Sequence, residues 1–133
     1  MDETSRHSGI APINDMEMYY ETRGDGEPLV LLHGGGGVGA NWNLVFKDSP
    51  QGYQLIVPDL RGHGSSTNPS KTFTFRQSAL DVFALLDHLI VDRFKAIGMS
   101  MGAKTLLHMA TQQPARVDAM VLVSATPYFP EQA

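Results

Sequence analysis

Short apolar runs alternate along the chain with longer segments in which apolar residues recur every three or four positions. Four runs have the length and composition of strands buried on both faces: Pro28–Leu32, Tyr53–Val57, Phe94–Ile97 and Val117–Val123. Helices are predicted between them at Ala40–Lys47, from Thr74 to about Ile90 and at Ser100–Gln113. This order predicts an α/β fold with a mostly parallel, twisted sheet and helices on both faces.

The helix that begins at Thr74 has the clearest pattern. Thr74 and Gln77 form a capping-box signature, in which each residue can bond the backbone of the other. Apolar residues then recur at helical spacing and form one stripe, while Asp81 falls mostly off it. The following helix is predicted to stop at Pro114, which cannot continue a helical hydrogen-bond ladder.

The amino-terminal part of the chain is patterned differently. Residues 1–15 are polar and are predicted to be a loose lead-in. Met16–Thr22 has strand character and breaks at Gly24-Asp25-Gly26, which predicts a hairpin or an edge strand. Residues 16–133 are therefore interpreted as a partial core domain that ends after the Val117–Val123 strand.

Composition narrows the class of protein. The 133 residues are 42% hydrophobic and 18% charged, which is typical of one globular domain. The net charge is −4 without a Lys/Arg block, so we expect neither nucleic acid nor a membrane as partner. Cysteine is absent, which excludes disulfides, thiolate zinc sites and a cysteine nucleophile. The polar amino terminus lacks a signal-peptide pattern, and a cytoplasmic location is expected.

The strongest chemical motif is Gly98-Met99-Ser100-Met101-Gly102, a G-x-S-x-G sequence between a predicted strand and a predicted helix. A sharp turn at that place exposes the serine Oγ, and the helix amino terminus favours a developing negative charge. Ser100 is thus the predicted nucleophile, and the Met101 N–H is one predicted oxyanion donor. The alternative is a tight turn whose serine only caps the helix.

A second glycine-rich segment, His33–Gly37, follows the first predicted strand of the parallel sheet. Loops at the carboxyl ends of parallel strands share one edge of the sheet, so this segment is expected near Ser100. Glycines allow backbone N–H groups to approach a ligand closely. Gly35, or alternatively Gly36, is predicted to supply the second oxyanion donor, and a flexible turn is the competing interpretation.

The stretches LVLLHGGGG, VPDLRGHGSS, AIGMSMGA and PARVDAMVLVSATP, together with Trp42, resemble the α/β-hydrolase superfamily in order and spacing. The resemblance is to its branch of ester hydrolases, C–C hydrolases and epoxide-hydrolase-like proteins, and within that branch Ser100 favours the esterase-like serine hydrolases, because the epoxide-hydrolase and dehalogenase subgroups carry aspartate at this position. It implies hydrolysis of a small carboxylic ester through an acyl-enzyme on Ser100, without a cofactor or metal. Substrate contacts are expected at four residues: Gly34, Gly36, Trp42 and Met99.

The resemblance also implies a triad in the chain order serine, acid, histidine. The acid and histidine would follow the Val117–Val123 strand, and Ser124, Ala125 and Thr126 offer no acid there. The chain is therefore expected to be a catalytically incomplete amino-terminal half. Two of its five histidines, His33 and His63, lie in loops at the edge of the sheet formed by the carboxyl ends of the strands, which we call the rim. The resemblance gives His33 a structural role, so His63 is the candidate for a substitute general base.

An incomplete sheet has a consequence for partners. The Val117–Val123 strand would be an edge with unpaired backbone groups and apolar side chains. Such an edge predicts association with another copy, or with a separate chain that supplies the remaining half.

Two other functions compete with ester hydrolysis. Gly34, Gly36 and Gly39 match G-x-G-x-x-G, and Asp59 follows at the end of the next strand, as in dinucleotide-binding domains. A non-catalytic member of the same fold, used as a binding module, is the other, because fold alone does not decide function.

Overall fold

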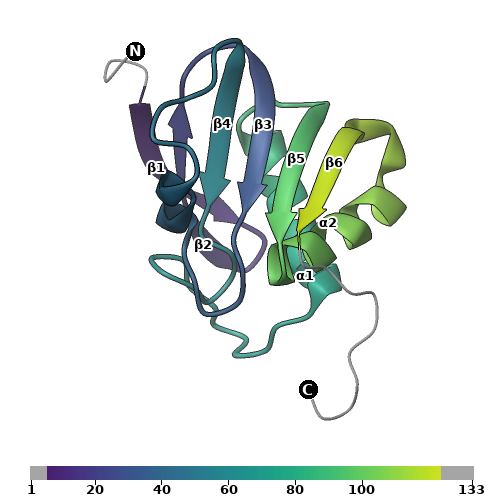
Figure 1. The fold of residues 1–133 in the computed structure, drawn as a ribbon. Helices are drawn as coiled ribbons and strands as arrows, with labels where there is room; N and C mark the ends of the chain where they lie inside the picture. Colours follow the sequence, from purple (N-terminus) through teal and green to yellow (C-terminus); the bar gives the residue numbers. More distant parts are fainter. Residues whose placement is uncertain (1–5, 124–133) are drawn as a thin grey trace.

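The computed structural model describes residues 6–123, which form one six-stranded sheet in the order β1-β2-β4-β3-β5-β6 (Figure 1). The strands are β1 (Arg6–Ile13), β2 (Met16–Arg23), β3 (Glu27–Leu32), β4 (Tyr53–Pro58), β5 (Phe94–Met99) and β6 (Val117–Val123). Strands β4, β3, β5 and β6 are parallel, whereas β2 pairs antiparallel with both β1 and β4. The predicted mostly parallel α/β sheet is confirmed.

The prediction of a loose lead-in over residues 1–15 is wrong for the described part, because Arg6–Ile13 forms the edge strand β1. Ala11 and Ile13 are buried on the same face, and a turn at Asn14 joins the strand to β2. Pro12 weakened the strand signal, yet an edge strand tolerates proline because one side of its backbone has no partner.

Within the described residues, two α-helices and two 3₁₀ helices connect the strands: η2 (Gly39–Leu44), α1 (Phe75–His88), α2 (Met101–Gln112) and η3 (Pro114–Arg116). The predicted cap of α1 is confirmed, because the Gln77 N–H donates to Thr74 Oγ1 at 3.0 Å. The reciprocal bond of the capping box is replaced, since the Gln77 side chain donates to Asp81 instead. Within residues 6–123, none of the helices has the length and apolar character needed to span a bilayer.

The path of the chain decides which face each helix covers. From β3 the chain moves to β4 in one direction, and it then returns past β3 to β5 and β6 in the other. Because crossovers between parallel strands are right-handed, this reversal places η2 on one face of the sheet and both α1 and α2 on the opposite face (Figure 1). The larger core lies under α1 and α2, and a smaller cluster surrounds Trp42.

Candidate active site

The carboxyl ends of β3 and β5 are adjacent, since Leu32 pairs with Gly98 in the parallel ladder. The chain leaves these two neighbouring strands toward opposite sides of the sheet, and ligands in open α/β sheets bind at such a reversal of strand order. The His33–Gly37 loop and the Ser100 turn both begin here. The structure therefore brings together the two segments that the sequence placed on one rim.

Ser100 occupies a strained turn between β5 and α2, with φ 52° and ψ −108°. Its side chain is exposed and makes no capping bond to α2, so the alternative of a serine that only caps the helix is not supported. The Ser100 N–H donates to the Val123 carbonyl at 2.8 Å, which anchors the turn on β6. Strain of this kind persists only where the surrounding structure imposes it, and it clusters at functional sites.

The turn is held by close backbone packing at Gly98 and Gly102. A methyl group on Gly102 would lie 2.3 Å from the Leu32 carbonyl oxygen, and one on Gly98 would lie 2.6 Å from the Gly102 carbonyl oxygen. Both separations are shorter than a carbon–oxygen contact allows. Only glycine at both positions lets α2 start directly against β3 and β5, which presents Ser100 at the edge of the sheet.

The glycine loop lies against this turn. A side-chain carbon built on Gly34 would lie 3.6 Å from Ser100 Cβ, and one on Gly35 would lie 3.6 Å from Met101 Sδ. Within the described residues the backbone N–H groups of Gly35 and Met101 donate to no backbone carbonyl. The structure thus brings the two N–H groups predicted as oxyanion donors to the neighbourhood of Ser100.

His33 fixes the start of the glycine loop. Its Nδ1 lies 2.7 Å from the Gly34 carbonyl oxygen, and its Nε2 accepts the Leu60 N–H at 3.0 Å. These two bonds require a neutral ring with the proton on Nδ1. Burial lowers the pKa of His33, which agrees with that state. Both ring nitrogens are occupied, so His33 positions the loop and is unsuited to act as a base.

His63 lies near the same loop, because its ring is 5.1 Å from the His33 ring and 6.0 Å from Phe73. Its Nδ1 lies 3.0 Å from the Arg61 carbonyl oxygen. No hydrogen bond joins His63 to Ser100 in the described part of the chain. The structure thus places the candidate substitute base near the rim without the contact that general-base catalysis needs.

The expected substrate contacts separate into two groups. Gly34 and Gly36 lie in the rim loop, where Gly36 has φ +77° and open space around its Cα, and Met99 is exposed beside Ser100. Trp42 is only 6% exposed and packs with Leu31, Leu55 and other residues of the smaller core. Trp42 is therefore a core residue in this structure, because η2 turns its indole toward the sheet.

Asp59 argues against a dinucleotide site. Its buried carboxylate accepts the Gly39 N–H at 2.8 Å and the Ser65 N–H at 3.0 Å, so it already holds two loops together. A 3₁₀ helix of six residues follows the glycines in place of the α-helix whose amino terminus would bind pyrophosphate. The parallel strands also follow the order 4-3-5-6, which differs from the dinucleotide-binding order.

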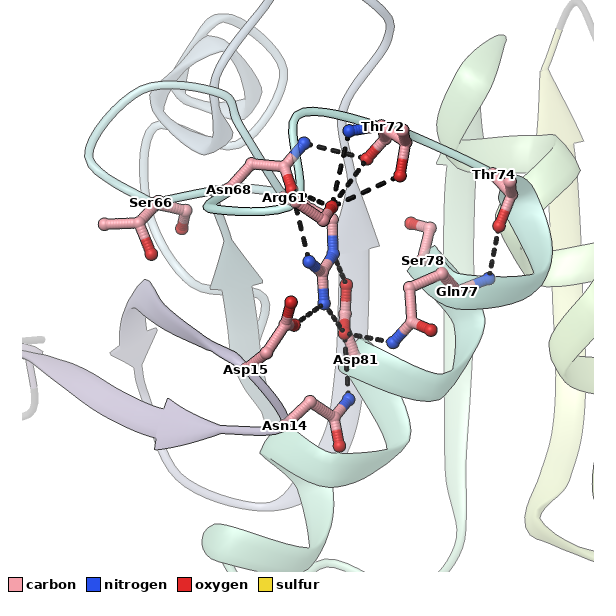
Figure 2. A network of polar contacts seen from close by, with 12 residues as sticks. Asn14, Asp15, Arg61, Ser66, Asn68, Thr72, Thr74, Gln77, Ser78 and Asp81 are labelled. Atoms are coloured by element: carbon pink, nitrogen blue, oxygen red, sulfur yellow. Dashed lines mark hydrogen bonds and ion pairs between the residues drawn. The ribbon is translucent and has the colours of Figure 1, made fainter.

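Sequence reasoning missed the polar network beside this rim, which Figure 2 shows. Arg61 Nε and Nη2 donate to the two oxygens of Asp81 at 2.8 Å each, and Nη2 also reaches Asp15 at 2.6 Å. Asn14 and Gln77 donate to Asp81 Oδ1 as well. The network joins the β1–β2 turn, the loop after β4 and α1.

The charged side chains of Arg61 and Asp81 in this network are buried and form an ion pair. Asp81 is completely buried, which contradicts its predicted place off the apolar stripe of α1. Hydrogen bonds to Asp81 raise the pKa of the Arg61 guanidinium, and the hydrogen bond from Arg61 lowers the pKa of Asp15. The available signal was helical spacing, because Asp81 lies three residues after Ser78 and four before Leu85, and all three are buried on α1.

In residues 6–123 no group of three or more His, Asp or Glu side chains is arranged to hold a metal ion. Ser124, Ala125 and Thr126, where a triad acid was sought, lie outside the described residues.

Residues 27–133 match the family model of the alpha/beta hydrolase fold, which covers most of the chain. The chain belongs to the α/β-hydrolase family. Solved structures with related sequences have the same fold. An epoxide hydrolase, CorEH, has a TM-score of 0.87 at 32% identity and is matched over 94% of this chain and 47% of its own. Est816, an N-acyl homoserine lactone degrading enzyme, has a TM-score of 0.83 at 30% identity over 92% of this chain and 49% of its own.

The names of the curated relatives include more than one kind of hydrolase. A soluble epoxide hydrolase of Corynebacterium sp. is 35% identical over 94% of this chain and 43% of its own length. A pimeloyl-[acyl-carrier protein] methyl ester esterase of Nitrosomonas europaea is 34% identical over 87% of this chain and 44% of its own length. The chain thus spans less than half the length of these relatives.

Proposed function

We propose that this chain provides the nucleophile and the oxyanion hole of a serine hydrolase that cleaves small carboxylic esters. The observation that carries the proposal is the exposed Ser100 at φ 52°, with no capping bond, beside the N–H groups of Gly35 and Met101, which donate to no backbone carbonyl within residues 6–123. The esterase among the relatives supports the same reaction class.

In this mechanism Ser100 Oγ attacks the ester carbonyl carbon and loses its proton to a base. The negative charge on the carbonyl oxygen is stabilised by the N–H groups of Gly35 and Met101 and by the amino terminus of α2. The intermediate then expels the alcohol, which takes a proton, and leaves an acyl group on Ser100. Water hydrolyses that acyl ester, releases the acid and restores the serine.

Within residues 6–123, no candidate base is hydrogen-bonded to Ser100. We infer that the acid and the histidine belong to the portion of the fold that the longer relatives have beyond the matched length. The chain alone is then expected to be weakly active or inactive, and His63 is the one rim histidine of residues 6–123 that could substitute.

The residue at position 100 separates ester from epoxide chemistry, although relatives of both kinds are about equally similar. A serine that opened an epoxide would form an ether, which water does not hydrolyse, so the enzyme would stop after one turnover. A serine that attacks an ester forms an acyl ester, which water can hydrolyse. Ser100 therefore favours ester substrates.

The test is hydrolysis of p-nitrophenyl acetate by this chain, with imidazole added as an external base. Wild type is expected to exceed Ser100→Ala by at least tenfold in imidazole, and the acetyl group should be found on Ser100 by mass spectrometry. Ser65→Ala, which removes another exposed rim hydroxyl, should retain the wild-type rate. Equal rates of wild type and Ser100→Ala at every imidazole concentration would contradict the proposal and favour a binding module.

A further inference from the structure

The glycine loop on the rim closes as a β-turn. The Gly37 N–H donates to the Gly34 carbonyl oxygen at 3.1 Å, and Gly36, the third residue of the turn, has φ +77°. The bond that closes such a turn uses the N–H of the fourth residue, so the N–H groups of the second and third residues stay outside it. These groups belong to Gly35 and Gly36. The position of the predicted oxyanion donor therefore depends on how firmly this turn is held.

A run of glycines does not hold a turn by itself. Glycine has more conformational freedom than any other residue, and apart from its chain neighbours no atom lies within 4 Å of the place that a Gly36 side chain would take. On the incoming side the turn is tied by His33, whose Nδ1 bonds the Gly34 carbonyl oxygen. The outgoing side needs a restraint of its own, which must come from residues after Gly37.

Asn41 supplies that restraint. Its Oδ1 accepts the Val38 N–H at 2.9 Å, and its own N–H donates to the Val38 carbonyl oxygen at 3.0 Å, so both backbone groups of Val38 are bonded to Asn41. The same Oδ1 lies against Gly37, because a side-chain carbon built on Gly37 would be only 2.6 Å from it. One side chain thus contacts the residue whose N–H closes the turn and holds the residue that follows it.

The hydrophobic core does not depend on Asn41. Its side chain is exposed on the first turn of η2, and other residues attach that helix to the fold. Trp42 is buried against the sheet. Arg23, which is buried on β2, donates to Asn43 Oδ1 at 2.7 Å and to the Phe46 carbonyl oxygen at 3.3 Å. The side-chain bond of Asn41 therefore acts on the end of the glycine turn rather than on the attachment of η2.

We propose that Asn41 is a positioning residue of the oxyanion hole, which holds the turn at Gly34–Gly37 so that the Gly35 N–H stays beside Ser100. The inference deepens the proposed function and rests on it, since a fixed turn matters to catalysis only if Gly35 donates to the oxyanion. Loss of a whole oxyanion donor slows acyl transfer roughly 100- to 1,000-fold. Asn41→Ala loosens the donor without removing it, so acylation of Ser100 is expected to slow about tenfold.

The experiment measures acetylation of Ser100 in this chain by p-nitrophenyl acetate with added imidazole, followed by mass spectrometry over a range of ester concentrations. In Asn41→Ala the maximal rate should fall about tenfold, while the ester concentration that gives half of this rate changes less than about twofold, because the oxyanion forms only in the reaction. Asn41→Asp keeps an oxygen acceptor and should stay within about threefold of wild type. Asn43→Ala is the matched control. It removes a contact between η2 and Arg23, leaves the turn intact and should react at the wild-type rate.

Hydrogen exchange of the backbone amides, measured by NMR, reports on the turn without any reaction. The amides of Gly37 and Val38 should exchange at least fivefold faster in Asn41→Ala than in wild type, and at the wild-type rate in Asn43→Ala. The proposal is overturned if exchange is unchanged in Asn41→Ala, if that variant is acetylated as fast as an active wild type, or if Asn43→Ala is slowed equally. A wild type no faster than Ser100→Ala would instead contradict the proposed function, and exchange alone would then decide whether Asn41 holds the turn.

Discussion

The two sides of the candidate site are held in opposite ways. The Ser100 turn depends on missing side chains, because Gly98 and Gly102 let three backbone segments touch. The loop after β4 depends on side chains, because Arg61 and Asp81 form a buried ion pair that ties it to α1. The first arrangement should therefore fail when atoms are added, and the second when a charge is removed.

The largest expected effect is on the loop after β4, which depends on side chains. Asp81→Ala should lower the free energy of unfolding by about 3–5 kcal/mol, because it leaves the buried Arg61 guanidinium with only the exposed carboxylate of Asp15 as an ionic partner. Asp87→Ala, on the same helix, removes only an exposed carboxylate paired with Arg116, which keeps its bonds to backbone carbonyls, and should cost about 0–1 kcal/mol. Urea unfolding followed by circular dichroism measures both, and equal losses would show that burial of the pair is unimportant.

In the Ser100 turn, Gly102→Ala should lower the free energy of unfolding by about 3 kcal/mol. Its methyl group would overlap a backbone carbonyl that cannot move aside. Gly52→Ala is the matched control. Gly52 has φ +89° and open space, so alanine there should cost only the backbone strain of about 1–2 kcal/mol. Denaturant midpoints should rank the variants in this order, and the reverse order would contradict the packing argument.

The contrast also explains how much of the structure could be predicted from sequence. The Ser100 turn was predictable because its glycines and serine lie close together in the chain, and the strands beside it are short apolar runs. The network was not, because Asp15, Arg61 and Asp81 come from three distant segments that only the tertiary fold brings together. Strand β1 was missed because Gly9 and Pro12 interrupt its pattern.

Trp42 illustrates a different limit. The sequence placed it correctly in a short helix after the glycine loop, but a helix can turn an aromatic residue toward ligand or core. Which face of the sheet η2 covers depends on the reversal of strand order at β3, and local sequence carries no signal for strand order.

A smaller effect is expected at Ser100 itself. Ser100→Gly should raise the free energy of unfolding by about 1 kcal/mol, because glycine adopts φ 52° and ψ −108° with less strain. Ser100→Ala keeps the strain and should leave stability nearly unchanged. Thermal unfolding distinguishes the two, and equal stability of both variants would mean that the turn is not strained.

The smallest expected effect is a pH dependence from His33, whose pKa is lowered by burial from its ordinary value of 6.5. As the pH falls below about 6.5, His33 binds a proton in the unfolded chain but stays neutral in the folded chain. The free energy of unfolding therefore decreases from its value above pH 6.5 until the pH reaches the lower pKa of the folded state. Asp15, whose pKa is lowered by Arg61, acts only at and below its ordinary value of 3.8.

The two pH ranges can be separated by unfolding measurements between pH 7 and pH 5. His33→Asn should flatten the stability profile in that range, whereas Asp15→Asn should not change its slope. A wild-type profile that stays level down to pH 5 would show that protonation of His33 does not destabilise the fold, and it would contradict the assignment of His33 Nε2 as the acceptor of the Leu60 N–H.

The place of β3 in the middle of the sheet also determines when the site can form during folding. One side of β3 is filled early by β4, the next strand along the chain, but its other side waits for β5, which arrives only after the whole of α1. Pairings between distant segments form slowly. The Ser100 turn, which follows β5, is thus expected to be among the last parts to appear, and a nascent chain would carry an unpaired edge of its central strand until then.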